Sequence, residues 1–193
     1  MPFHMNIVPL ISIKKGLLFD GRDGTALSID ELFTRVEKDT MLYVLDYDGL
    51  EHINPNLDLY QKLTEHCILW IDNGPRRIDD VMDTIMAGAT NITLRESLWP
   101  ALDMPGVQEL TDDEIYLDKT AQYQEQKTLQ HVYSGDIGTI LFNEEALYGA
   151  FSKERTANQK IYLYTSSLEK IQLWTEQGIS GIIIDLNKKQ GVV

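Results

Sequence analysis

Eight short apolar runs, most of them separated by a single helical segment, constrain the fold of this 193-residue chain. The runs cover residues 6–13, 41–46, 67–71, 91–94, 114–118, 139–143, 160–164 and 181–185. Alternation of strand and helix predicts parallel strands joined by right-handed crossovers. Eight such units close most naturally into a (β/α)₈ barrel, and an open doubly wound parallel sheet is the alternative.

The predicted barrel is a short one. The fold typically takes about 250 residues, whereas 193 residues are enough for one domain with a substantial core. The missing length falls between the fifth and sixth runs, where residues 121–136 are polar and weakly periodic. We therefore predict a single domain over residues 1–193. Its barrel is expected to be shortened between the fifth and sixth strands, where a long loop stands in place of a full helix.

The composition argues against several classes of partner. With 17 basic and 30 acidic residues the net charge is −13, so the chain lacks the basic face that nucleic acids or anionic membranes require. No run approaches the roughly 20 apolar residues of a membrane span, and the start does not resemble a signal peptide. The one cysteine, Cys67, cannot form a disulfide within the chain. We predict an acidic cytoplasmic protein that binds neither nucleic acid nor membrane.

Polar side chains follow the apolar runs, at the ends of strands where parallel α/β folds bind ligands. The clearest case is the run 41–46, which ends in Asp46 and is followed closely by Asp48. Other runs lead into Asp72-Asn73-Gly74, Arg95, Asp118, Thr165-Ser166 and Asp185. Because parallel strands bring their carboxyl ends together, we expect these groups to surround one mouth of the barrel.

Two interpretations of the aspartates stay open at this point. Clustered carboxylates repel one another unless a cation neutralises them, and Mg²⁺ prefers such oxygen ligands. Aspartates at strand ends also commonly cap turns, and this structural role is the favoured one for Asp46 and Asp48. The four histidines show no pair at metal-ligand spacing, so we predict no histidine metal site and no obligatory cofactor.

Four segments resemble the histidine-biosynthesis family of (β/α)₈ barrels, a ribonucleotide isomerase and its cyclase relative. Residues 8–16 (VPLISIKKG) are similar to the family's first strand, and residues 42–50 (LYVLDYDGL) to the isomerase's second strand. Residues 79–89 with Ile92 are similar to its third helix and fourth strand, and residues 178–184 to its last strand. The resemblance implies a barrel of small-molecule metabolism, with a small metabolite, phosphorylated or unphosphorylated, as its ligand.

The resemblance also implies catalytic positions. The isomerase moves its protons with two aspartates on opposite sides of the substrate, an arrangement that suits general acid–base chemistry. Asp118 matches the second aspartate, whereas Ser12 stands at the first, and a serine needs a base of its own. The catalytic candidates are Asp118 and Ser12, which stand at these two positions, and Asp46 as a further carboxylate expected at the mouth.

The family's glycine-rich phosphate-binding turns are altered as well. The expected substrate contacts are Asp48, Asp72, Asn73, Gly74, Arg95, Thr165 and Ser166, with a helix beginning at Ser166 or Ser167. We therefore expect a different or lost activity, isomerase-like if the protein is an enzyme. The alternatives are a divalent-cation-dependent enzyme and a non-catalytic binding or regulatory barrel.

Overall fold

The computed structural model describes residues 5–124, 133, 136–151 and 159–189. Eight parallel strands pair in chain order, and the last pairs with the first to close a barrel. They are β1 (Asn6–Lys14), β4 (Thr40–Asp46), β5 (Cys67–Asp72), β6 (Ala89–Leu94), β7 (Ile115–Asp118), β8 (Gly138–Leu141), β9 (Ile161–Thr165) and β10 (Gly181–Asp185). Closure confirms the predicted α/β barrel and excludes the open sheet.

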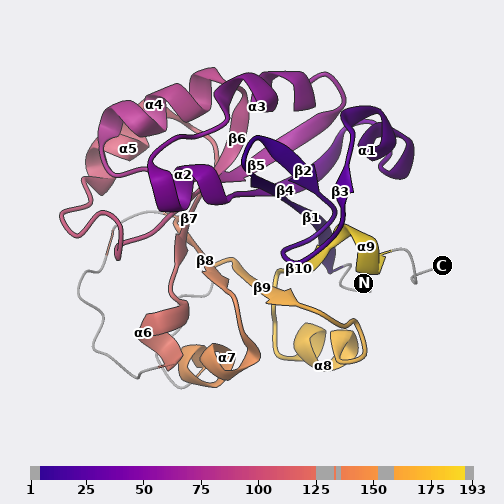
Figure 1. Ribbon diagram of the computed structural model, residues 1–193. Coiled ribbons are helices and arrows are strands. Elements are labelled where there is room, and N and C mark those ends of the chain that lie inside the picture. The colour runs from indigo at the N-terminus through magenta and orange to yellow at the C-terminus, as the bar shows by residue number, and fades with distance from the viewer. Residues whose placement is uncertain (1–4, 125–132, 134–135, 152–158, 190–193) are drawn as a thin grey trace.

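Helices alternate with the barrel strands and lie around the outside, with α3, α4 and α5 on one side and α6, α7 and α8 on the opposite side (Figure 1). Their bounds are α1 (Ile29–Arg35), α2 (Tyr47–His52), α3 (Leu57–Leu63), α4 (Ile78–Met86), α5 (Met104–Leu110), α6 (Thr120–Gln124), α7 (Glu144–Phe151), α8 (Ile171–Glu176) and α9 (Leu186–Lys189). Among the described residues, no helix has both the length and the apolar character needed to cross a membrane.

A small hairpin precedes the first helix. Strands β2 (Leu17–Phe19) and β3 (Ala26–Leu27) are antiparallel, and β2 pairs with the end of β1. Helix α1 then begins at a capping box, because the Ser28 hydroxyl accepts from the Glu31 amide and the Glu31 carboxylate accepts from the Ser28 amide.

The connection after β7 differs from the prediction of a loop over residues 121–136. Residues 120–124 form helix α6, so the prediction is wrong for residues 121–124. The Asp118 carboxylate accepts from the Thr120 amide at 3.0 Å and so fixes the start of this helix. Residues 125–132 and 134–135 lie outside the described residues, and the predicted shortening of the barrel there stays a prediction.

Aromatic rings fill the barrel interior. The Trp70 ring lies 5.2 Å from the Tyr43 ring, 4.1 Å from the Tyr116 ring and 4.9 Å from the Tyr162 ring, measured between centroids. Glycine makes room for two of these rings, because a Cβ on Gly138 would come within 2.2 Å of the Tyr116 ring. A Cβ at position 181 would come within 2.3 Å of the Tyr162 ring. The interior is therefore a packed core.

Strand alternation sorts the remaining side chains. On β4, Tyr43 and Leu45 belong to the interior cluster, whereas Leu42 and Val44 pack outward against the helices. The same alternation decides, at the carboxyl end of each strand, whether a polar side chain faces the mouth or the helical layer.

Candidate functional site

The carboxyl ends of the strands form a mouth, and only some of the predicted residues point into it. A residue two positions beyond an interior side chain faces the same way, so it points into the mouth. Five polar side chains meet this condition: Ser12, Asp72, Arg95, Asp118 and Asp185, which follow the interior residues Leu10, Trp70, Thr93, Tyr116 and Ile183. Asp46 follows the inward Leu45 and therefore points outward. The expectation of one acidic rim thus holds for Asp72, Asp118 and Asp185.

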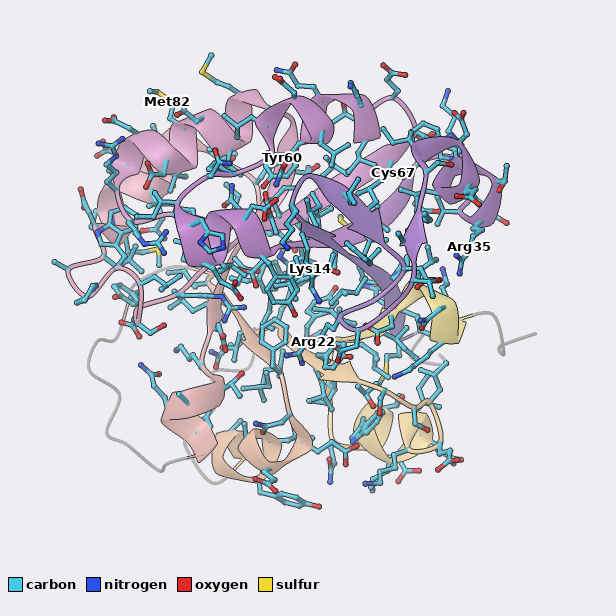
Figure 2. All side chains as sticks on the ribbon, in the orientation of Figure 1. Lys14, Arg22, Arg35, Tyr60, Cys67 and Met82 are labelled. Carbon is cyan, nitrogen blue, oxygen red and sulfur yellow. The ribbon has the colours of Figure 1, made fainter. Side chains whose placement is uncertain are left out.

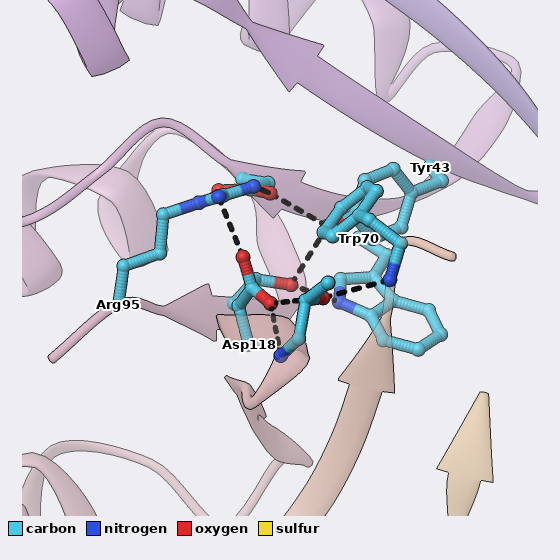
Figure 3. Close-up of polar contacts among 8 residues, drawn as sticks. Tyr43, Trp70, Arg95 and Asp118 are labelled. Atoms are coloured by element: carbon cyan, nitrogen blue, oxygen red, sulfur yellow. Dashed lines mark hydrogen bonds and ion pairs between the residues drawn. The ribbon is translucent and has the colours of Figure 1, made fainter. Parts of the chain in front are cut away.

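Arg95 binds two of these aspartates at once, as Figure 3 shows. Its Nε and Nη2 atoms lie 3.0 and 2.6 Å from the two oxygens of Asp72, and its Nη1 atom lies 2.6 Å from Asp118. Asp72 is 0% exposed and also accepts from the Tyr43 hydroxyl at 2.8 Å. Burial acts to lower the pKa of Arg95, but the two carboxylates raise it and the net shift is upward. The three side chains form one cluster held by two ion pairs.

Asp118 has both carboxylate oxygens occupied. One oxygen accepts from Arg95, and the other accepts from the Thr120 amide at 3.0 Å and the Thr120 hydroxyl at 2.6 Å. A proton taken from a substrate would have to compete with these donors. The catalytic role of Asp118 stays a prediction, and the contacts favour the role of a counter-ion to Arg95.

Ser12 is buried and its hydroxyl donates to the Gly21 carbonyl at 2.7 Å. Its hydroxyl has no contact with a histidine or carboxylate among the described residues, so it lacks the base that would activate it. The hydrogen bond instead anchors the hairpin loop, residues 20–25, at the mouth.

Asp185 anchors the same loop from the opposite side of the β1–β10 junction. Its carboxylate accepts from the Arg22 amide at 3.1 Å and from the Tyr164 hydroxyl at 3.1 Å, and Lys188 pairs with it at 3.5 Å. The backbone passes so close that a Cβ on Gly21 would lie 2.8 Å from the Asp185 Cγ atom. The loop is therefore fixed at the barrel mouth.

Besides Arg95, whose guanidinium lies 5.0 Å from the centroid of Phe142, two cations of this region lie over aromatic rings. The Arg22 guanidinium is 4.8 Å from the centroid of Tyr164 and 5.6 Å from that of Phe142, and the Lys14 ammonium is 4.6 Å from that of Tyr47. Figure 2 shows Lys14 and Arg22 near the centre of the view, whereas Arg35 and Met82 lie at its periphery.

These two cations differ from Arg95 in their partners. The Lys14 ammonium donates to the Arg22 carbonyl at 2.7 Å. Among the residues that the structure describes, neither Lys14 nor Arg22 forms a side-chain ion pair with a carboxylate. Burial acts to lower the pKa of Arg22, but Tyr47, Tyr164 and the charge of Asp185 raise it, and the net shift is upward. Arg22 is therefore cationic at any physiological pH.

Asp46 lies outside the barrel, beneath the second and third helices. It caps α2 by accepting from the Asp48 amide at 3.0 Å and the Gly49 amide at 3.2 Å. It also accepts from the Asn56 amide at 2.8 Å, from the Asn56 side chain, and from the Tyr60 hydroxyl. These contacts favour the structural interpretation that the sequence left open for this residue.

Asp48 has a similar role in the turn that follows β1. Its oxygens accept from the Lys15 amide at 2.8 Å and the Gly16 amide at 2.9 Å. Burial acts to raise the pKa of Asp48, whereas Asn56 and the two amides lower it, and the net shift is downward. Asp48 holds a turn, and its substrate contact stays a prediction.

The other predicted substrate contacts are dispersed. Asn73 is buried and donates to the Thr84 hydroxyl at 2.9 Å, while the Gly74 carbonyl accepts from Arg76 at 3.0 Å. Both lie in the turn between β5 and α4, and neither of these hydrogen bonds involves Arg22 or Lys14. Their binding roles stay predictions.

The segment after β9 corrects the prediction of a helix start at Ser166 or Ser167. Helix α8 begins at Ile171 with Lys170 as its N-cap. Thr165 and Ser167 instead bond one another, because the Ser167 amide donates to the Thr165 hydroxyl, which itself donates to the Ser167 carbonyl. Ser166 is exposed in this turn. No helix N-terminus is therefore available here to bind an anion.

The magnesium alternative finds no support in the geometry. Over the described ranges, no group of three or more histidine, cysteine, aspartate and glutamate side chains is placed to hold a metal ion. Arg95 already neutralises Asp72 and Asp118, and Asp185 already accepts from three donors.

Sequence reasoning missed the aromatic and basic members of this mouth. Alternation could have found four of them, because Lys14, Tyr47, Phe142 and Tyr164 lie two residues beyond the interior positions Ser12, Leu45, Ile140 and Tyr162. Arg22 comes from a loop, where no periodic signal exists. Comparison adds no identification, since no protein-family model matches the chain and no curated protein sequence matches it significantly.

Proposed function

We propose that this barrel binds a small anionic metabolite, such as a sugar phosphate, at its C-terminal mouth through Arg22 and Lys14. One observation carries the proposal: Arg95 is neutralised by Asp72 and Asp118, whereas the side chains of Arg22 and Lys14 form no ion pair with a carboxylate among the described residues. A guanidinium beside an ammonium matches the charge and geometry of phosphate.

The setting strengthens such an interaction. Arg22 and Lys14 are half-buried, and the rings of Tyr47, Phe142 and Tyr164 replace part of the water around them. Charge attraction is larger in this partly desolvated environment than on an exposed surface. The anchored hairpin loop keeps the two cations together before the ligand arrives, which lowers the entropic cost of binding.

We infer that any reaction here differs from the isomerisation of the histidine-biosynthesis barrels. Ser12 bonds a carbonyl, and Asp118 is paired with Arg95, so neither is free to exchange protons with a substrate. A sugar-phosphate enzyme of another kind and a non-catalytic anion-binding barrel both fit the mouth. Membership of that family and a cytoplasmic location stay predictions from the sequence.

Replacing Arg22 with glutamine is expected to weaken anion binding by about 10- to 100-fold, the loss expected for charge-assisted hydrogen bonds. The measurement is calorimetric titration of the full chain with inorganic phosphate and with ribose 5-phosphate, supported by the ligand-dependent rise in melting temperature. Arg77→Gln is the matched control, because it removes the same charge from a side chain that is 72% exposed on α4. Equal binding by the two variants, or no binding of either anion by the unaltered chain, would refute the proposal.

Purified protein is expected to convert the substrate of the ribonucleotide isomerase at least about 10²- to 10⁴-fold more slowly than a functional isomerase. This range is the usual contribution of one general acid or base, and here both catalytic positions are engaged. A direct turnover assay at saturating substrate measures it. Turnover at the rate of a working isomerase would contradict this expectation.

A further inference from the structure

A cavity lies at the end of the barrel opposite the mouth, where the strands begin. Its volume is about 390 Å³, and its lining includes Asn6, Met41, Trp70, Asn91, Glu114 and Tyr162. Most of these residues lie at the first positions of their strands or just before them, so the cavity opens on the N-terminal face. The aromatic core separates it from the mouth, and it is independent of the proposed function.

Asn91 is the side chain in this cavity that lacks a partner. It is 7% exposed and stands opposite Trp70 in the β5–β6 ladder. Two residues further on, Thr93 accepts from the Trp70 indole at 3.0 Å inside the barrel, so alternation also directs Asn91 inward. Among the residues that the structure describes, none hydrogen-bonds the Asn91 side chain. Buried amides are normally hydrogen-bonded, so the partners of this one would come from what fills the cavity, either water or a ligand.

The charged groups of the cavity are already paired with one another. Glu114 forms an ion pair with Lys160 and accepts from the Tyr116 hydroxyl. The Asn6 amide donates to the Tyr162 hydroxyl at 3.2 Å. No unpaired charge among these groups remains to attract an ion, and Trp70 and Met41 supply apolar walls. The chemistry favours a neutral ligand.

We propose that this cavity binds a small, neutral, planar molecule that presents a hydrogen-bond donor beside an acceptor, as a nucleobase edge or a primary carboxamide does. A carboxamide side chain offers the complementary acceptor and donor, and asparagine binds adenine through such a pair of hydrogen bonds. A cavity of about 390 Å³ is within the range of small-molecule sites.

The first test compares matched probes on the full chain. Adenine and purine differ by the exocyclic amino group, and nicotinamide and 3-acetylpyridine differ by the amide nitrogen. We expect adenine or nicotinamide to bind, with its matched analogue at least about tenfold weaker, because one hydrogen bond is lost. Titration by calorimetry gives the affinities, and the shift of the Asn91 side-chain amide in a ¹H–¹⁵N spectrum locates the site.

The second test is Asn91→Leu, which keeps the shape of the side chain and removes both hydrogen-bonding groups. Because the amide has no protein partner to lose, the melting temperature should stay the same or rise, while probe binding weakens at least about tenfold. Arg22→Gln should leave probe binding unchanged, and Asn91→Leu should leave phosphate binding unchanged, so the two sites are tested separately.

Three outcomes would overturn the proposal. The first is that neither adenine nor nicotinamide binds, which would mean that water alone occupies the cavity. The second is that each probe and its analogue bind equally. The third is that Asn91→Leu binds the probes as the unaltered chain does, or that its melting temperature falls, which would show a structural role. The comparison of probes on the unaltered chain decides the matter even if the variant fails to fold.

Discussion

Arg95→Met is expected to lower the free energy of unfolding by about 3–5 kcal/mol, the usual cost of leaving a buried charge without its partner. Asp72 is 0% exposed, and loss of Arg95 would leave the Tyr43 hydroxyl as its one hydrogen-bond donor among the residues that the structure describes. Asp118 would keep its two bonds to Thr120 but lose its counter-ion. At about 2–4 °C per kcal/mol for a chain of this size, the melting temperature should fall by roughly 10 °C.

Urea unfolding followed by circular dichroism measures this effect. Arg77→Met is the control, because an exposed ion pair contributes at most about 1 kcal/mol. The double variant Asp72→Asn with Arg95→Met should recover part of the loss, since the buried negative charge is removed together with its partner. A loss below about 1 kcal/mol for Arg95→Met would show that water reaches Asp72 and that the cluster is not a buried one.

Asp46→Ala is expected to cost at least about 3 kcal/mol, because several buried donors lose one acceptor together. The cap of helix α2 alone is worth about 1 kcal/mol. The Tyr60 hydroxyl and the Asn56 amide would then be left in an interior where Asp46 is 0% exposed. Chemical unfolding gives the change in stability.

Asp58→Ala is the control for Asp46→Ala, since Asp58 is exposed in the first turn of the neighbouring helix α3. Its expected effect is within about 0.5 kcal/mol, as for most surface substitutions. Phosphate binding at the mouth should persist in the folded fraction of Asp46→Ala. A stable Asp46→Ala protein that has lost ligand binding or turnover would instead support the catalytic role predicted from the sequence.

Strand positions were predictable because each barrel strand is a short, largely apolar run, and all but β6 and β8 end in a polar residue. Leu45 and Asp46 show the limit of that signal, since the run ends at the right place but the alternation inside it decides which side faces the mouth. Asp72 was expected at the mouth and lies there. Its bond to Arg95 joins residues 23 positions apart on neighbouring strands, and spacing along the chain does not encode which carboxylates an arginine will reach.

Two predictions of local structure, the helix start after β9 and the loop after β7, were wrong for a similar reason. Ser166 and Ser167 have the composition of a helix start, but the Thr165 hydroxyl bonds within the turn and the helix begins later. Residues 121–124 have weak helical periodicity and still form α6, because Asp118 fixes the first turn from the preceding strand. In both places the deciding side chain, Thr165 or Asp118, belongs to the preceding strand and so lies outside the segment whose periodicity was used for the prediction.

The β1–β10 junction has a consequence for how the chain folds. Asn6 pairs with Gly181, which makes this the contact of longest sequence separation in the barrel, and loops of that length close slowly. During synthesis this edge of β1 therefore lacks its β10 partner until residues 181–185 have emerged. Strand β2 covers the part of that edge from Ser12 to Lys14 early, because it is only a turn away. The hairpin thus shortens the bare strand edge that nascent chains would otherwise present to one another.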